Sequence, residues 1–354
     1  MNILLITGAS GFVGQHAVRL GLADPKYEIV IANDVRDLPY AVNPCGKNFY
    51  FFKSDLTNPE SLQDLRNEFF KLWGYGLTIW HIGGCFNYSA PYDFLYHVNV
   101  LGTRNLMEML CSLGVGCIQR FVFWSGGVLY GKFDHPQGKL PADEQYPVNP
   151  QNGYGWSKKE AEDWIMFFHR KEGLPTTIMR LPAIYGPGAS YGLATAFFLN
   201  ARGVLPPILI GNPHNKTPLI HVEDVIRVAD FLSGVPESNG EIYNVTDYYG
   251  SYPVEKVAKL IGEQLNNGYG NFSLPAWILK VFIALVQLRA KQLSGQPLID
   301  PELGHMSVLN AWMSNAKLLS LLSQYGFSES FFKYPDGLKG LIEVIQWYKK
   351  EGKL

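Results

Sequence analysis

The sequence predicts an α/β protein built on a doubly wound, mainly parallel sheet, and three observations support that prediction. Short apolar runs of strand length alternate with segments of helical periodicity over the first half of the chain. The first run, residues 3–6, leads directly into a glycine-spaced turn. The chain has 354 residues, 47% of them hydrophobic, which suffices for about two domains with a sizeable core.

The first βαβ unit can be followed residue by residue. Residues 3–6 form a continuous apolar run, typical of a strand buried on both faces. Val13, Ala17 and Leu20 then recur at helical spacing, and residues 28–34 supply a second β-branched run. A strand, a helix and a strand of these lengths predict two parallel neighbouring strands joined by a crossover helix.

The same alternation continues through the first half of the chain. It predicts strands at 49–53, 78–81, 120–125 and 176–180, with helices near 60–72, 93–113 and 154–171. The connection 126–153 is rich in Pro and Gly and is too long for an ordinary loop, so we expect it to be functional.

Beyond residue 180 the pattern becomes irregular, which predicts a smaller, discontinuous C-terminal substrate domain. Strands are still expected at 219–221 and 241–245, separated by a helix near 222–232. Elsewhere prolines interrupt the helical stretches: Pro182, Pro187, Pro206, Pro207, Pro213 and Pro218. The predicted boundaries are 1–180 with 215–245 for the first domain, and 181–214 with 246–354 for the second.

Composition excludes several classes of function. A net charge of −1 leaves no basic excess for a nucleic-acid partner, and 14% aromatic residues are too many for a disordered chain. The low charge leaves open a large core, an apolar substrate pocket or a membrane-facing surface. No metal-ligand spacing and no GxSxG motif occurs, which argues against a metal site and a serine hydrolase.

The cysteines and the N-terminus indicate a reducing compartment. Cys45, Cys85, Cys111 and Cys117 lack CxxC spacing and are expected to be free thiols. Residues 1–8 contain no positive region ahead of an apolar run, so a signal peptide is not predicted. We therefore expect a cytoplasmic protein.

The glycine-spaced turn predicts dinucleotide binding. Gly8, Gly11 and Gly14 lie between the first strand and the first helix, where backbone N–H groups and the helix dipole can hold a pyrophosphate. Asp34 ends the second strand 20 residues after Gly14, where a carboxylate would accept hydrogen bonds from the adenosine ribose. That carboxylate would repel a 2′-phosphate and favours NAD over NADP, although Arg36 weakens the preference.

The Gly8-x-x-Gly11-x-x-Gly14 spacing resembles that of the extended short-chain dehydrogenase/reductases, the NAD-dependent epimerase/dehydratase superfamily. Further motifs along the chain resemble the same family: 54–56, 81–84, 99–103, 121–131, 154–158, 180–188 and 221–225. The resemblance implies a Rossmann fold and a homodimer formed through the two helices that contain Asn105 and Tyr154. It also implies NAD as the cofactor, bound by Gly8, Ser10, Gly11, Phe12, Val13, Gly14, Asp34, Asp55, Leu56, Ile82, Gly83, Asn99, Tyr154, Lys158, Pro182 and Ile184.

Tyr154 and Lys158 form a YxxxK pair, the most specific chemical signal in the sequence. Residues four apart share one helix face, so the Lys158 ammonium can lie near the Tyr154 phenol. An adjacent cation favours the ionised phenol, which suits Tyr154 to general acid/base catalysis near neutral pH. On a solvated helix the same spacing is common without function. The resemblance implies that Lys158 also holds the nicotinamide ribose.

The hydroxyl that usually completes such a site is not at its usual position. Counting back from Tyr130-Gly131, that position falls on Gly126, and Ser125 lies one residue earlier. Consecutive strand side chains point to opposite faces. Ser125 remains the candidate third catalytic residue. The alternatives are another hydroxyl, weakened hydride transfer, or an NAD-binding sensor or scaffold with little catalysis.

The substrate is the least determined property. Sugar-nucleotide enzymes of this family commonly place an Asn near the position of Ala183 and an Arg near that of Thr217, and both are absent. Residues 274–288 carry a single charge, Lys280, and are too short to span a membrane. This segment is consistent with a helix in the buried core, with a lid over an apolar substrate, or with an interfacial helix anchored by Trp277 and Lys280.

The looser resemblance to the 3β-hydroxysteroid dehydrogenase branch therefore predicts NAD-dependent hydride transfer on a small, apolar, sterol-like alcohol or carbonyl. An NAD-dependent sugar-nucleotide epimerase or dehydratase is the alternative.

Overall fold

The computed structural model describes residues 2–39, 42, 46–72, 74–201, 209–267, 273–275, 277, 278, 281 and 309–354. These residues fall into two compact units. The first comprises Met1–Leu129, Gly153–Leu181 and Val225–Tyr243, and the second comprises Tyr130–Asn152, Pro182–Asp224 and Asn244–Leu354. Each unit is described by itself below.

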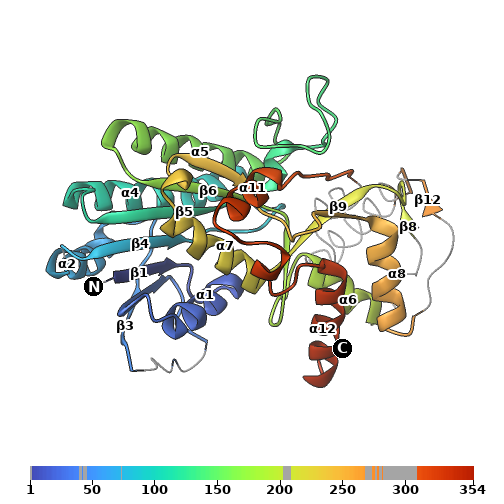
Figure 1. The fold of residues 1–354 in the computed structure, drawn as a ribbon, viewed down its shortest axis with the longest axis horizontal. Helices are drawn as coiled ribbons and strands as arrows, with labels where there is room; N and C mark the ends of the chain where they lie inside the picture. The colour runs from blue at the N-terminus through green and yellow to red at the C-terminus, as the bar shows by residue number, and fades with distance from the viewer. Residues whose placement is uncertain are drawn as a thin grey trace. The chain divides into compact units, whose positions relative to one another are not determined.

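The first unit contains a seven-stranded sheet with the strand order β10-β6-β5-β4-β1-β2-β3 (Figure 1). Neighbouring strands from β6 to β3 pair in parallel. The strands are β1 (Asn2–Thr7), β2 (Ile29–Asp34), β3 (Asn48–Lys53), β4 (Gly76–His81), β5 (Ile118–Gly126), β6 (Thr176–Leu181) and β10 (Glu241–Asn244). The predicted doubly wound α/β fold is confirmed.

Helices cover both faces of this sheet (Figure 1). On one face, apolar side chains of α2, α4 and α5 form a single buried core with alternate residues of the strands. On the other face, α1 approaches closely at Gly21, where an added Cβ would lie 2.6 Å from Leu4 Cδ2. The helices are α1 (Phe12–Ala23), α2 (Gln63–Lys71), α4 (Gly102–Leu113), α5 (Gly153–Glu172) and α7 (Val222–Gly234), with the 3-10 turns η1 (Pro59–Leu62), η3 (Gly127–Tyr130) and η4 (Pro236–Ser238).

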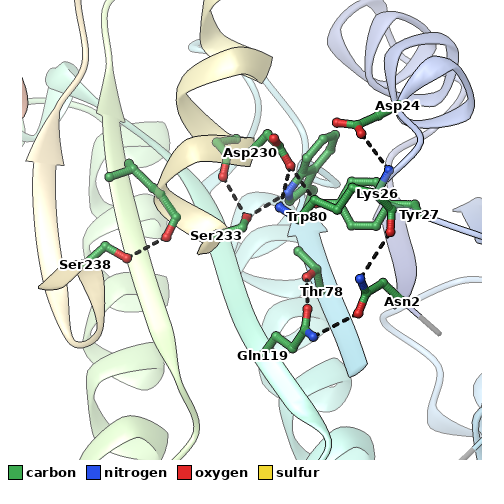
Figure 2. Close-up of polar contacts among 12 residues, drawn as sticks. Asn2, Asp24, Lys26, Tyr27, Thr78, Trp80, Gln119, Asp230, Ser233 and Ser238 are labelled. Atoms are coloured by element: carbon green, nitrogen blue, oxygen red, sulfur yellow. Dashed lines mark hydrogen bonds and ion pairs between the residues drawn. The ribbon is translucent and has the colours of Figure 1, made fainter. Parts of the chain in front are cut away.

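Polar contacts join α7 to the sheet, as Figure 2 shows. Asp230 accepts hydrogen bonds from Lys26 Nζ at 2.8 Å and from Tyr27 Oη at 2.7 Å. One turn further along α7, Ser233 Oγ accepts from Trp80 Nε1 at 3.1 Å. Since Tyr27 and Trp80 are almost fully buried, these bonds satisfy donors that would otherwise lie unpaired in the interior.

The single helix predicted over 93–113 is wrong in one respect. It is divided into α3 (Tyr92–Leu95), the π-helical segment η2 (Tyr96–Leu101), and α4. π turns often occur at functional sites. Here the wider turn contains Asn99, which is 1% exposed and hydrogen-bonds to the backbone of Cys85. This long-range contact is invisible to helical periodicity.

The second unit contains a three-stranded sheet in the order β11-β9-β7 and a two-stranded pair, β12-β8. The strands are β7 (Ala183–Tyr185), β8 (Leu209–Ile210), β9 (Lys216–His221), β11 (Ser251–Pro253) and β12 (Ser273–Leu274). Its helices are α6 (Leu193–Ala201), α8 (Val254–Gln264), α11 (Ala316–Gln324) and α12 (Gly337–Lys350), with the 3-10 turn η5 (Glu329–Phe331).

The two units differ from the predicted domain boundaries mainly over 130–152 and 215–224, which the prediction placed in the first domain, and by one or two residues at 181 and 244–245. Strand β9 pairs with β7 and β11 rather than with the large sheet. The long connection has a small core of its own, in which Tyr130, Phe133 and Tyr146 pack with Met313. These contacts of high sequence separation group both segments with the second unit.

Two further predictions concern thiols and apolar segments. Cys85, Cys111 and Cys117 are free thiols, and Cys45 lies outside the described residues. Within the described part of the chain, no helix has both the length and the apolar character that crossing a membrane requires. Most of the predicted apolar segment 274–288, including Lys280, lies outside the described residues, and Trp277 is 62% exposed.

Candidate active site

The glycine turn between β1 and α1 has space for backbone only. Gly8 has a φ of +71°, and a Cβ there would lie 2.7 Å from Gly83 Cα. A Cβ on Gly14 would lie 2.0 Å from the Gly8 carbonyl oxygen. The N-cap of α1 is Gly11, which contributes no side-chain hydrogen bond to the first turn. The tight turn and the start of α1 that follows it fit the pyrophosphate of a dinucleotide.

Asp34 ends β2 beside this turn and has a role that the sequence did not reveal. Its carboxylate accepts hydrogen bonds from the backbone N–H of Ser10 at 2.9 Å and of Arg36 at 3.0 Å. Asp34 therefore fixes the turn to the sheet. An ionised carboxylate has about four acceptor positions, so capacity remains for ribose hydroxyls.

The remaining residues predicted to bind the adenosine half surround the ends of β1 to β4. Phe12 and Val13 are buried in the first turn of α1. Asp55 is exposed and accepts a hydrogen bond from the Thr57 N–H at 2.8 Å, while the Leu56 carbonyl accepts from Asn105 Nδ2 at 2.9 Å. Their contacts with adenine stay predictions, because these bonds account for the local turn by themselves.

Tyr154 and Lys158 both lie in the first two turns of α5, as the YxxxK spacing predicts. Lys158 Nζ donates to the Trp124 carbonyl at 2.9 Å and lies 6.0 Å from the centre of the Tyr154 ring. Burial lowers the pKa of Lys158 to about 8, and the nearby Glu162 carboxylate opposes that shift. A cation that titrates close to neutral pH thus lies beside the phenol.

Two aromatic side chains of the β4–α3 connection surround the Tyr154 ring, and sequence reasoning did not single them out. Phe86 and Tyr88 approach that ring edge-on, with centroids at 5.2 Å and 5.4 Å. Such T-shaped pairs restrict ring orientation and provide an apolar wall. The signal was the aromatic pair that closely follows Gly83-Gly84.

The Ser125 hydroxyl is engaged on the far side of β5 from Trp124. It donates to Glu162 Oε1 at 2.5 Å. Both Glu162 oxygens also accept from Arg180, through Nε at 3.1 Å and Nη2 at 2.8 Å, and both side chains are 4% exposed. This buried, bidentate pair was missed by sequence reasoning, although Glu162 lies one turn after Lys158.

Asn99 connects the loop after β4 to the start of α5. Its amide donates to the Cys85 carbonyl at 3.1 Å and to Ser157 Oγ at 2.9 Å, and its oxygen accepts from the Cys85 N–H at 2.7 Å. Ser157 Oγ in turn donates to the Tyr154 carbonyl at 2.8 Å. Asn99 therefore holds the catalytic helix through its side chain.

The first unit gathers most of the predicted site residues at the carboxyl ends of β1, β2, β4 and β5. The loop after β4 contains Ile82 and Gly83, and the Gly83 N–H donates to Thr7 Oγ1 at 3.0 Å. Pro182 and Ile184 belong instead to the second unit, where Ile184 pairs with Ile220 of β9.

A family model described as "NAD dependent epimerase/dehydratase family" matches residues 4–246. The chain is 25% identical over 337 residues to a UDP-glucuronate 4-epimerase of Thermodesulfobacterium geofontis, covering 90% of this chain and 98% of that protein. It is also 25% identical over 367 residues to a 3beta-hydroxysteroid-dehydrogenase/decarboxylase of Arabidopsis thaliana, covering 98% of this chain and 80% of that protein.

The fold is likewise that of a solved structure. The dTDP-glucose 4,6-dehydratase of Bacillus anthracis, crystallised with NAD, aligns with a TM-score of 0.69 at 20% identity and covers all of this chain. The alignment also covers 98% of the dehydratase chain.

Proposed function

This chain belongs to the NAD-dependent epimerase/dehydratase family, and on that basis we propose that it converts a sugar nucleotide by transient oxidation of a sugar hydroxyl. The observation on which the proposal depends is the Tyr154–Lys158 pair, in the same unit as the glycine turn. Membership makes the protein an NAD-dependent enzyme. The substrate class is the proposed part.

The chemistry at the protein side follows from Tyr154 and Lys158. The Lys158 ammonium favours the ionised phenol, so Tyr154 can take the proton of a substrate hydroxyl as the carbonyl forms and return it when the carbonyl is reduced. Lys158 is fixed for that task by its bond to the Trp124 carbonyl. Phe86 and Tyr88 line the phenol ring and reduce its contact with water.

NAD, when bound, supplies the hydride acceptor and donor that this reaction needs. Gly8 and Gly14 let the turn pack tightly where its pyrophosphate is expected, and Asp34 lies where the adenosine ribose is expected. In an epimerase or dehydratase the hydride is returned within one turnover, so no reduced cofactor accumulates. A dehydrogenase would instead release it.

Sugar nucleotides are supported as the substrate class by the relatives. The alignment with the UDP-glucuronate 4-epimerase covers 98% of that protein, and the family model matches residues 4–246 of this chain. The missing Asn at Ala183 and Arg at Thr217 imply that the nucleotide phosphates are held by other groups. Lys216 of β9 offers one such charge.

A second candidate substrate is a 3β-hydroxysterol or a similarly apolar alcohol. The Arabidopsis relative matches 98% of this chain, and the aromatic wall around Tyr154 would suit an apolar ring system. This candidate predicts net oxidation.

The test uses the NAD-loaded protein with two panels of substrates. UDP- and dTDP-sugars are followed by chromatography and by NMR, and 3β-hydroxysterols by absorbance of reduced cofactor. The proposal expects conversion of at least one sugar nucleotide without stoichiometric release of reduced cofactor. Turnover of sterols alone, with reduced cofactor released, would overturn it in favour of the second candidate.

Tyr154→Phe should lower kcat by about 10²- to 10⁴-fold, because it removes the acid/base hydroxyl while keeping the ring and its aromatic contacts. Tyr75→Phe is the matched control, since Tyr75 is exposed and precedes β4 at the opposite end of the sheet. Equal kcat values for the two variants would contradict an acid/base role and favour the scaffold alternative.

The homodimer also stays a proposal. The exposed faces of α4 and α5 provide the surface that the family resemblance implies, and Trp156 and Phe167 of α5 are 48% and 41% exposed. Light scattering of Trp156→Glu against the unmodified protein tests it, with a monomer expected for the variant. A cytoplasmic location also stays a proposal, and the free thiols Cys85, Cys111 and Cys117 support it.

A further inference from the structure

A buried histidine lies between the two halves of the site described above. His81 is the last residue of β4 and is 1% exposed. Its Nδ1 lies 2.7 Å from Thr7 Oγ1, and its Nε2 lies 2.8 Å from Thr103 Oγ1. Both threonines are almost completely buried. Thr7 ends β1 just before the glycine turn, and Thr103 lies in the first turn of α4.

The surrounding groups fix where each proton lies. The backbone carbonyl of Asn99 can only accept a hydrogen bond, so the Thr103 hydroxyl donates to it at 2.6 Å. The Thr103 oxygen must then accept from a protonated Nε2 of His81. On the other side of the ring, Thr7 Oγ1 accepts a hydrogen bond from the Gly83 N–H at 3.0 Å. The hydroxyl proton of Thr7 is then donated to Nδ1 of His81.

His81 is therefore neutral, with its single proton on Nε2. The charge balance agrees, since burial lowers the pKa of His81 to about 3, and the Lys158 ammonium acts in the same direction. Phe121 and Phe123 enclose the ring, with centroids at 5.5 Å and 5.6 Å. No carboxylate faces the imidazole among its described contacts.

The bonds around His81 continue at both ends into the site. At one end, the backbone of the glycine turn packs against the loop after β4, and Gly83 of that loop donates to Thr7. At the other end, Asn99 donates to Ser157 Oγ, which donates to the Tyr154 carbonyl. Hydrogen bonds thus link Thr7, which precedes the glycine turn, through His81 and Thr103 to the backbone of Asn99, and the Asn99 side chain continues to the helix that contains Tyr154 and Lys158.

We propose that His81, in its neutral Nε2–H form, is a positioning residue that couples the dinucleotide-binding turn to the catalytic helix. It acts through Thr7 and Thr103 and touches neither substrate nor cofactor itself. The inference rests on Tyr154 as the acid/base of the proposed function, but not on the identity of the substrate.

Nitrogen NMR provides the first test, with no substrate needed. Long-range ¹H–¹⁵N correlations of labelled protein, with His81 assigned through His81→Gln, should show a protonated Nε2 and a bare Nδ1 from pH 5 to 9. In Thr103→Val the acceptor for Nε2–H is lost, so the proton should move to Nδ1 and be donated to Thr7 Oγ1. A proton on Nδ1 in the unmodified protein, or a doubly protonated ring at pH 6, would overturn the proposal.

A double-mutant cycle provides the second test. Thr7→Val and Thr103→Val each remove one hydroxyl at nearly constant shape, and each should lower kcat by about tenfold at saturating NAD. Since His81 connects the two, the second substitution should cost much less once the first is present. Thr176→Val is the control, because Thr176 is equally buried in β6 and its hydroxyl has no hydrogen-bond partner in the described structure.

The outcomes separate coupling from simple destabilisation. Additive losses in kcat, or losses matched by Thr176→Val, would show that the threonines stabilise the fold without coupling, and would overturn the proposal. The NMR result stays interpretable if no sugar nucleotide is converted. Failure of this inference is therefore distinguishable from failure of the proposed function.

Discussion

At the scale of single residues, the site depends on where charge and hydroxyl groups are held. Lys158 is buried beside Tyr154 and donates to the Trp124 carbonyl oxygen. Ser125 is bonded to a carboxylate that itself pairs with Arg180. These partners come from β5, α5 and β6, so no local motif could have specified them.

The pKa of Lys158 leads to a prediction on pH. The NAD-free protein should hold its ammonium below about pH 8 and lose it above, because burial disfavours the charged form. ¹³C NMR of labelled lysine Cε, with Lys158→Met for assignment, measures this directly. Glu162→Gln should lower the pKa further, since the Glu162 carboxylate raises it. A resonance that titrates at about 10.4, as for a free lysine, would refute the prediction.

Catalysis should decline over the same range. Lys158 favours the Tyr154 phenolate only while it is charged, so kcat/KM is expected to fall as the pH rises above about 8 when this group controls the rate.

Gly126 occupies the position at which the family resemblance expects a hydroxyl, and Ser125 is engaged elsewhere. A Cβ at Gly126 would meet Val128 Cγ1 at 3.4 Å, an ordinary contact, so a serine fits. We predict that Gly126→Ser raises kcat by about tenfold or more, because a donor to the reacting oxygen stabilises the transition state. Gly126→Ala is the matched control. Unchanged or lower kcat in the serine variant would mean that another hydroxyl completes the site.

At the scale of elements, polar contacts add to the buried apolar face of α7. Asp230 accepts from Tyr27 and Lys26, and Ser233 accepts from Trp80 (Figure 2). Removing Asp230 leaves the buried Tyr27 hydroxyl without the acceptor of its proton, and an unsatisfied buried donor costs more than the hydrogen bond itself contributed.

Asp230→Ala should therefore reduce stability by about 1–3 kcal/mol, seen as a lower Tm in calorimetry. Asp37→Ala is the control, because Asp37 pairs with Lys53 at the exposed surface, where such pairs contribute little. Equal Tm values for the two variants would show that α7 does not depend on this contact.

At the scale of the whole chain, the α/β class and the mainly parallel sheet follow from patterns that are local in sequence. Buried strands are unbroken Val, Ile and Phe runs, and helices repeat their apolar residues every three or four positions. The domain boundaries were harder to predict from the sequence. Residues 130–152 group with the second unit through packing against Met313, and residues 215–224 do so because β9 pairs with β7 and β11. Such partners are distant in sequence and leave no periodic signal.

The sequence by itself determined the α/β class and the place of the glycine turn, of the acidic end of β2 and of the Tyr154–Lys158 pair, and from them it predicted the NAD site. Each of these is fixed by a short spacing whose geometry is set by one strand, one turn or one helix. The tertiary structure alone decided the π turn at Asn99, the pairing of Ser125 with Glu162, and the two threonine partners of His81. The reason is physical, since each depends on burial and on hydrogen-bond partners brought together from separate strands and helices.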